Sequence, residues 1–229
     1  MKVVVLTGAG ISAESGLRTF RGNDGLWEDE KIEDVATPEG YYRDRAKVRN
    51  FYNKLRAKLP DVKPNAAHYA LAELEKKLGD EFLLVTQNVD DLHERAGNKR
   101  VLHMHGELKK LRCENNEDHV FDFGGTETAD TKCPECGAPT RPHIVWFGEM
   151  PLYMDTIEKA LTKCKEFVYI GTSSVVYPAA GFKRIAHGYG AHVTCLNLEL
   201  NERDPDTDTF IQGKAGDIVP AWCEKFEKA

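Results

Sequence analysis

The chain has 229 residues, of which 41% are hydrophobic and 30% are charged, and its formal net charge is −6 at pH 7. This size and composition fit one large globular domain, alone or with a small insert, and the acidic balance argues against a nucleic-acid-binding protein. No apolar run is long enough to span a membrane, and the first predicted strand begins directly after Lys2, which leaves no space for a signal peptide. We therefore expect a cytoplasmic protein with neither a membrane nor a nucleic-acid partner, and we expect a monomer.

The first predicted element is a buried strand over 3–7 that leads into a glycine-rich turn and a helix. Gly8, Gly10 and Ala13 fit the pattern G-x-G-x-x-A, which is typical of a dinucleotide-binding turn. Gly8 would let the chain turn sharply, Gly10 would let a pyrophosphate approach the backbone, and Ala13 would let helix and strand pack closely. Free N–H groups at the start of the helix would then bind the phosphates. The pattern predicts a dinucleotide but leaves open whether it is a redox carrier or is consumed.

Short apolar segments alternate with helical patterns along the rest of the chain. Segments with the composition of strands buried on both faces are 3–7, 82–86, 167–171 and 193–198. The helical patterns are 65–78, 153–164, 179–188 and 218–226. This alternation predicts an α/β fold with a doubly wound parallel sheet. The polar stretch 18–40 is predicted to be a long loop, and 109–142, which holds three of the six cysteines, is predicted to be a small insert.

Polar residues follow the strand predicted over 82–86. Gln87, Asn88 and Asp90 stand where side chains of an open α/β sheet point into the ligand crevice. Their amide and carboxylate groups suit ribose hydroxyls and a carboxamide, although Asn88 or Asp90 would also serve to cap the next helix. His105 precedes Gly106 and is a candidate general base, because the unperturbed pKa of histidine is about 6.5. A structural, hydrogen-bonded role fits His103 better.

The cysteines of the insert have metal-ligand spacing. Cys133 and Cys136 form a C-x-x-C knuckle followed by a glycine, and Cys113 lies upstream at a separation typical of a zinc ribbon. Asn116 stands where a second knuckle would have a cysteine. The candidates for the fourth ligand are therefore His119, Asp118 and Glu117, of which a neutral imidazole suits zinc best. We predict one structural zinc ion; the alternative is a degenerate ribbon that binds metal weakly or not at all.

Taken together, several motifs resemble the sirtuins, which are NAD-dependent protein lysine deacylases, and specifically their bacterial CobB-type, class III branch. The motifs are GAGISAESGLRTFRG, TQNVDDLHERAG, HMHGEL, PHIVWFGE, GTSSVVYPAA and NLE, in order along nearly the whole chain. The resemblance implies a single catalytic domain: a Rossmann-like α/β part with a small zinc-ribbon module inserted, and the active site between them. The corresponding ranges are about 1–40, 80–108 and 143–229 for the large part, 41–79 for a helical insert and 109–142 for the zinc module.

The resemblance also implies roles for individual residues. The NAD-binding residues would be Gly8, Ala9, Gly10 and Ser12 at the phosphates, Phe20, Arg21 and Trp27 in the cofactor loop, Gln87, Asn88 and Asp90 at the nicotinamide ribose and carboxamide, and Gly171, Thr172, Ser173, Asn197, Leu198, Glu199 and Ala215 at the adenosine half. The catalytic residues would be His105 and Asn88. Val145, Phe147 and Gly148 would pair with the substrate backbone as an added strand. The spacing of the cysteines, rather than the resemblance, gives the metal ligands as Cys113, Cys133 and Cys136, with His119 as the preferred fourth.

The acyl preference depends on a departure from the class III pattern Tyr-x-x-Arg. Tyr52 matches the tyrosine, but Leu55 stands at the arginine position and Arg56 follows it. Positions i and i+4 share a helix face, so Arg56 would be able to receive an acyl carboxylate; the alternative is a solvated helix residue. Arg49, one turn earlier, is another candidate. The resemblance thus implies deacetylation, with desuccinylation and demalonylation if Arg56 reaches the pocket. The products would be nicotinamide, O-acyl-ADP-ribose and free lysine.

Three other functions compete with deacylation. A Rossmann oxidoreductase needs an acidic residue after a second strand about twenty residues beyond the glycines, and this interval is predicted to be loop. A zinc-ribbon module that binds nucleic acid is disfavoured by the many acidic residues of the insert. An NAD-dependent ADP-ribosyltransferase would use the same cosubstrate and remains an alternative.

Overall fold

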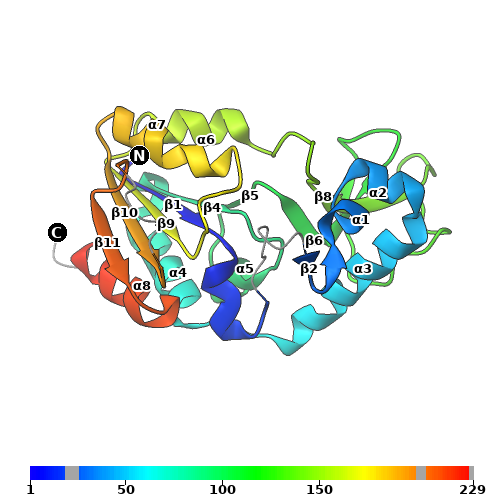
Figure 1. The fold of residues 1–229 in the computed structure, drawn as a ribbon, viewed down its shortest axis with the longest axis horizontal. Coiled ribbons are helices and arrows are strands. Elements are labelled where there is room, and N and C mark those ends of the chain that lie inside the picture. Colours follow the sequence, from blue (N-terminus) through cyan, green and yellow to red (C-terminus); the bar gives the residue numbers. More distant parts are fainter. Residues whose placement is uncertain (19–25, 200–204, 227–229) are drawn as a thin grey trace.

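The computed structural model describes residues 1–18, 26–199 and 205–226, which form a larger and a smaller part (Figure 1). The larger part is built on a six-stranded parallel sheet in the order β11-β10-β9-β1-β4-β5. Its strands are β1 (Val3–Thr7), β4 (Phe82–Thr86), β5 (Val101–His103), β9 (Glu166–Ile170), β10 (His192–Asn197) and β11 (Thr209–Gln212). Helices α6 (Met154–Leu161) and α7 (Phe182–Gly188) cover one face, and α4 (Ala66–Leu78) and α8 (Ala215–Cys223) cover the other. The predicted doubly wound parallel sheet is confirmed.

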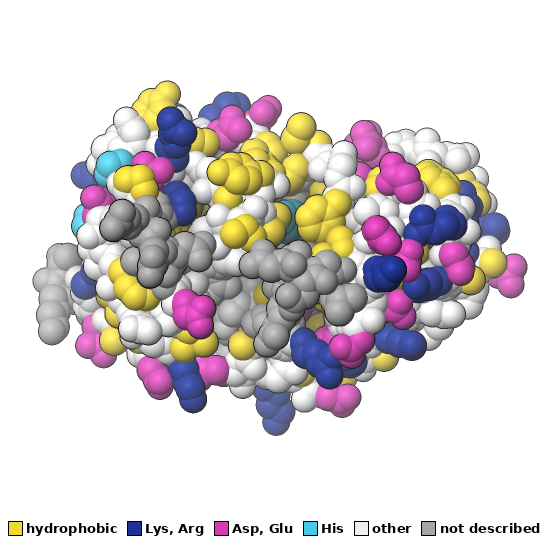
Figure 2. Space-filling model, viewed as in Figure 1, with side chains coloured by type: hydrophobic (Ala, Val, Ile, Leu, Met, Phe, Trp, Pro, Cys, Tyr) yellow, Lys and Arg dark blue, Asp and Glu magenta, His cyan; other side chains and the backbone are white. Residues whose placement is uncertain are grey.

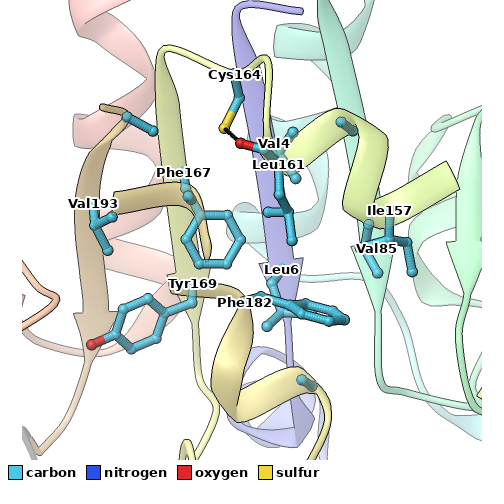
Figure 3. Close-up of a cluster of buried hydrophobic side chains, with 14 of the residues drawn as sticks. Val4, Leu6, Val85, Ile157, Leu161, Cys164, Phe167, Tyr169, Phe182 and Val193 are labelled. Atoms are coloured by element: carbon cyan, nitrogen blue, oxygen red, sulfur yellow. Dashed lines mark hydrogen bonds between the residues drawn. The ribbon is translucent and has the colours of Figure 1, made fainter. Parts of the chain in front are cut away.

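The central strand β1 shows why this sheet forms. All five of its residues are buried, and the first four alternate between two hydrophobic clusters. Val4 and Leu6 pack against α6 and α7 (Figure 3), whereas Val3 and Val5 pack against α4 and α8. Burial of each such side chain contributes about 1.5–3 kcal/mol. A strand whose first four residues are apolar is therefore stable only between two helical layers.

The smaller part contains a three-stranded antiparallel sheet in the order β7-β6-β8. Its strands are β6 (Gly106–Cys113), β7 (Val120–Asp122) and β8 (Thr140–Ile144), and its helices are α1 (Ile32–Val35), α2 (Pro38–Arg43) and α3 (Arg45–Lys58). Aromatic residues of α2 and α3 pack with Trp146 in a separate core. The remaining elements are the hairpin β2 (Leu26–Trp27) and β3 (Glu30–Lys31), helix α5 (Leu92–Ala96), and 3-10 turns at Ala9–Ser15, Leu59–Asp61, Gly79–Glu81, Ala179–Gly181 and Glu224–Phe226.

Three expectations differ from the structure. The stretch 18–40, expected to be a loop, contains β2, β3 and α1 and the start of α2; Thr37 caps α2 by accepting the Gly40 N–H, and Pro38 follows it. The range 41–79 is not one insert, because α3 packs on β6 and β8 whereas α4 packs on α8 and the main sheet. The helix after the glycine turn is a seven-residue 3-10 helix. Among the described residues, no helix is long and apolar enough to cross a membrane.

Candidate active site

A cavity of about 700 Å³ lies between the two parts, a volume typical of ligand sites. Its polar side comes from the turns at the carboxyl ends of β1, β4, β9 and β10. Its apolar side comes from α3, β6, β8 and the segment after β8. Hydrophobic side chains gather around the middle of the face shown in Figure 2. The cavity therefore lies at the strand ends where an open α/β sheet is expected to bind ligands.

The glycine turn after β1 is packed against the turn after β9. The Gly8 N–H donates to the Ile170 carbonyl (2.9 Å), and the Gly10 N–H donates to the Gly171 carbonyl (2.8 Å). A Cβ atom on Gly10 would lie 2.6 Å from the Gly171 Cα, and Gly171 itself has a φ of +60°. The glycines are thus required for close contact between the two turns. This backbone contact is a further reason for glycine besides the phosphate approach that the sequence predicts.

A buried polar network follows β4. Asn88 Nδ2 donates to Ser12 Oγ (3.1 Å), and Ser12 Oγ donates to Asp90 Oδ2 (3.2 Å). Asp90 Oδ1 also accepts the N–H of Leu92, the first residue of α5 (3.1 Å), so Asp90 both lines the cavity and binds the start of the next helix. Burial raises the pKa of Asp90 to about 6. Gln87 Nε2 donates to Thr172 Oγ1 (3.0 Å), which ties the ends of β4 and β9 together.

His105 lines the cavity in a defined tautomer. Its Nδ1 lies 3.1 Å from the Gln87 carbonyl oxygen, and because a carbonyl only accepts, Nδ1 carries the proton in this bond. Nε2 is then left with its lone pair, as a general base requires. Burial lowers the pKa of His105, which keeps the imidazole neutral.

His103 is the structural histidine that the sequence indicates. It bonds the Asn88 carbonyl (2.9 Å) through Nδ1 and Glu94 Oε1 (2.7 Å) through Nε2. Burial acts to lower the pKa of His103, but the Glu94 carboxylate outweighs it and the pKa is raised. Two acceptors hold a protonated ring, so His103 is not available as a base.

The apolar side of the cavity is built around Tyr52. Trp146 Nε1 donates to the Tyr52 hydroxyl (3.0 Å), and burial raises the pKa of Tyr52, so the phenol is neutral and retains a proton to donate. The apolar residues near it on the lining are Leu55, Val89, Leu108, Ile144 and Trp146.

Arg56 lies outside this lining. Of the described residues on α3, Tyr52, Leu55 and Lys58 line the cavity and Arg56 does not. The Arg56 guanidinium is buried and donates to the Leu108 carbonyl (2.6 Å) and to Asn53 Oδ1 (2.8 Å). Arg56 is therefore neither the carboxylate fork nor the solvated helix residue that the spacing allowed. Leu55, three residues after Tyr52, lines the cavity at the position where the Tyr-x-x-Arg pattern has its arginine. That three-residue spacing is the sequence signal for the residue that faces the cavity.

The four predicted metal ligands converge at one point of the smaller part. The donor atoms of Cys113, His119, Cys133 and Cys136 all lie within 4.8 Å of one another. Cys113 Sγ is 3.5 Å from Cys136 Sγ, and Cys133 Sγ is 3.6 Å from His119 Nδ1. Zinc–ligand bonds of about 2.0–2.3 Å in a tetrahedron separate donor atoms by about 3.5–3.8 Å. The site fits a structural zinc ion with His119 as the fourth ligand, and none of the four residues lines the cavity.

Most of the other predicted site residues also line the cavity: Gly8, Ala9, Gly10, Ser12, Trp27, Gln87, Asn88, Asp90, Val145, Phe147, Gly148, Gly171, Thr172, Ser173, Asn197, Leu198 and Glu199. Ala215 does not, because it starts α8 and packs in the core. Phe20 and Arg21 lie outside the described residues. The lining also includes Tyr169 and Cys195, which the sequence analysis did not single out.

Comparisons with known proteins agree with this arrangement. The model of the Sir2 family matches residues 8–178. An NAD-dependent protein deacylase of Yersinia pseudotuberculosis is 57% identical over 228 residues, which cover 98% of this chain and 82% of that protein. A Sir2 homologue solved in complex with NAD is 38% identical, with a TM-score of 0.88 over 99% of this chain and 90% of that one. A Sir2 structure bound to a myristoylated histone peptide is 33% identical, with a TM-score of 0.75 over 99% of this chain and 91% of that one.

Proposed function

Because the chain belongs to the Sir2 family, we propose that it is an NAD-dependent protein lysine deacylase that releases nicotinamide, O-acyl-ADP-ribose and the free lysine. The observation that carries the proposal is the His105 tautomer, which presents a free Nε2 in a cavity that joins a dinucleotide-type turn to an apolar chamber. NAD is a cosubstrate of the enzyme, and zinc stabilises the smaller part at a distance from the reacting groups. The protein substrates of the enzyme carry acylated lysines.

The polar half of the cavity would bind NAD. The turn Gly8–Ser12 would receive the phosphates, and Gln87, Asn88 and Asp90 would receive the nicotinamide ribose and carboxamide. Thr172 and Asn197 are held together by a hydrogen bond (3.0 Å) from Asn197 Nδ2 to the Thr172 carbonyl, and would face the adenosine half. Because this hydrogen bond already holds Thr172 and Asn197 together, these two residues need little further ordering when NAD binds.

The reaction would proceed in two stages. The acyl oxygen of the substrate lysine attacks the ribose carbon that carries nicotinamide, and nicotinamide leaves. His105 Nε2 then takes the proton of a ribose hydroxyl, which attacks the former acyl carbon; one water completes the release of lysine and O-acyl-ADP-ribose. The bond from Nδ1 to the Gln87 carbonyl stabilises the imidazolium that His105 becomes.

We further propose that the enzyme prefers neutral acyl groups, acetyl and longer apolar chains, over succinyl and malonyl. The chamber beside Tyr52 is apolar, and the arginine and lysine on the lining, Arg18 and Lys58, are paired with Asp29 (2.8 Å) and Glu28 (2.7 Å). A carboxylate at the acyl tip would therefore lose water without gaining a free cation from the residues that the structure describes. The myristoylated peptide bound by the related Sir2 structure supports an apolar acyl chain.

Leu55→Arg tests this selectivity. A charged hydrogen bond from the new guanidinium to a succinyl carboxylate should raise kcat/KM for succinyl-lysine peptides about 10- to 100-fold and lower it for acetyl-lysine peptides. Ala57→Arg adds the same charge to an exposed position of the same helix and should leave both values near wild type. Efficient desuccinylation by the wild-type chain would contradict the proposal.

Mass spectrometry of the reaction with NAD and an acetyl-lysine peptide tests the activity itself. We expect equal amounts of nicotinamide, O-acetyl-ADP-ribose and deacetylated peptide, with loss of turnover in His105→Asn and retention in His187→Asn, an exposed histidine outside the cavity. ADP-ribose attached to the protein or peptide would favour the transferase alternative, and hydride transfer to NAD would refute the proposal. We also propose a cytoplasmic monomer, which light scattering after gel filtration tests for the oligomeric state.

A further inference from the structure

The side chain of Asn53 on α3 forms a pair of hydrogen bonds with the backbone of Glu127 in the smaller part, similar to the paired bonds between two β-strands. Its Nδ2 donates to the Glu127 carbonyl (2.8 Å), and its Oδ1 accepts the Glu127 N–H (2.9 Å). One carboxamide therefore satisfies both backbone groups of a residue 74 positions away. A pair of this kind fixes both distance and orientation, which a single hydrogen bond does not.

Further contacts surround this pair. Arg56 Nη1 donates to Asn53 Oδ1 (2.8 Å) and to the Gly125 carbonyl (3.3 Å), and the Arg56 guanidinium lies 5.3 Å from the centre of the Phe123 ring. The Glu127 side chain is buried, and its Oε1 accepts the Thr140 hydroxyl (3.1 Å). The segment around Glu127 is thus bound on one side to α3 and on the other to β8.

Thr140 connects this segment to the metal site. It pairs with Cys113 in the register of β6 and β8, and its hydroxyl also lies 3.4 Å from the Thr131 carbonyl, two residues before Cys133. Two of the four metal ligands, Cys113 and Cys133, therefore lie on segments that contact Thr140. A metal ion that holds these segments together would also fix the Glu127 backbone.

Two neighbours of Asn53 on α3 line the acyl chamber, which is the apolar side of the cavity around Tyr52. Tyr52 precedes Asn53 on α3, and Leu55 lies two positions further on; both line the cavity. Trp146 donates to the Tyr52 hydroxyl and packs against the same aromatic core. A change in the placement of α3 would therefore move the chamber wall. The glycine turn and the turns after β4, β9 and β10, which would bind NAD, belong to the other part; Trp27 of the cofactor loop is an exception, because its ring packs against Phe51 and Tyr52 of α3.

We propose that Asn53 is a positioning residue that fixes the acyl chamber against the metal-bearing module, so that metal occupancy and acyl-substrate binding are coupled through the Asn53–Glu127 pair. The expected effect on acyl-peptide binding rests on the proposed deacylase function. The expected effect of the metal on the position of α3 does not. Asn53 itself touches neither acyl group nor NAD; it acts through Tyr52 and Leu55.

Kinetics of Asn53→Ala test the functional side. We expect KM for an acetyl-lysine peptide to rise about tenfold, equivalent to about 1.4 kcal/mol, while KM for NAD stays within about twofold of wild type. Lys54→Ala, at the exposed next position of α3, is the matched control and should leave both constants unchanged. Equal peptide KM values in Asn53→Ala and wild type, or an equal rise in both constants, would overturn the proposal.

A spectroscopic measurement that needs no enzymatic turnover tests whether the metal and Asn53 affect the packing around Trp146. The chain has three tryptophans, so 5-fluorotryptophan labelling gives three 19F resonances that single Trp→Phe variants assign. Removing the metal from the wild-type chain with a chelator should shift the Trp146 resonance and leave that of Trp222, in the α8 core, in place. Asn53→Ala with metal bound should shift the Trp146 resonance as well.

These two measurements separate the possible failures. If the wild-type chain turns over no acyl peptide, the deacylase function fails, yet the 19F comparison still decides the coupling. If Asn53→Ala does not fold, the chelation experiment on the wild-type chain decides it alone. A Trp146 resonance that stays fixed when the metal is removed would refute the coupling.

Discussion

Replacement of Gly10 by alanine perturbs the contact on which the polar half of the cavity depends. The added Cβ would lie 2.6 Å from the Gly171 Cα and 2.8 Å from the Gly171 carbonyl oxygen, both of them backbone atoms. Side-chain rotation relieves neither contact, so the turn after β1 must move away from the turn after β9. These are the turns that would hold NAD.

The size of the effect follows from this overlap. Forcing an extra methyl group into a close-packed contact costs about 1–3 kcal/mol. For a domain of this size each kcal/mol lowers the melting temperature by about 2–4 °C, so we expect Gly10→Ala to melt about 2–12 °C below wild type. Calorimetry measures this change, and steady-state kinetics should show a raised KM for NAD.

Gly188→Ala is the matched control, because a Cβ there meets no atom within 4 Å. Gly188 ends α7, and alanine should be neutral or should stabilise the protein by up to about 1 kcal/mol. The reasoning is refuted if Gly10→Ala melts at the wild-type temperature and binds NAD normally.

Two further predictions concern protonation. Because burial lowers the pKa of His105 from 6.5, the acid limb of kcat/KM should lie below pH 6.5; a pH–rate profile whose midpoint is at or above that value would contradict the assignment. Burial raises the pKa of Glu127 from 4.5 to about 7, so its contribution to stability is complete below about pH 4.5 and is lost as the pH rises through 7. Glu127→Gln, which keeps the backbone pair with Asn53, should abolish this loss of up to about 3 kcal/mol in urea unfolding measured from pH 5 to 8. An unchanged slope would show that Arg49, whose Nε lies 3.6 Å from Glu127 Oε1, keeps the carboxylate charged.

The central strands could be predicted from the sequence because they are buried on both faces. Val3–Thr7 and Phe82–Thr86 match their predicted bounds to the residue. The strands Val101–His103 and Thr209–Gln212 lie at the edges of the sheet and are mostly half-buried, so they lack a continuous apolar run. Strand Gly106–Cys113 carries an irregular register that interrupts its alternation.

The candidate site could be predicted where polar residues directly follow the end of a strand, as Gln87 and Asn88 follow β4. The acyl chamber was not, because helix periodicity places both Leu55 and Arg56 near the face of Tyr52. Which of them faces the cavity is decided by contacts distant in sequence: the Leu108 carbonyl and the Gly125 carbonyl take the Arg56 guanidinium. A side chain with several donors turns toward buried acceptors, and the apolar neighbour is left for the cavity.

The position of His105 follows from where the chain crosses between the two parts. His105 lies between the end of β5 in the large sheet and Gly106, the first residue of β6 in the small one. Gly106 has a φ of +84°, and a Cβ there would lie 2.0 Å from the His143 carbonyl oxygen, so only glycine permits this crossing. The proposed base is therefore placed by the connection between the two parts, and it lines the cavity. Any shift of the smaller part would change the distance from His105 to the acyl chamber while the hydrogen bond to the Gln87 carbonyl keeps the base beside the NAD half.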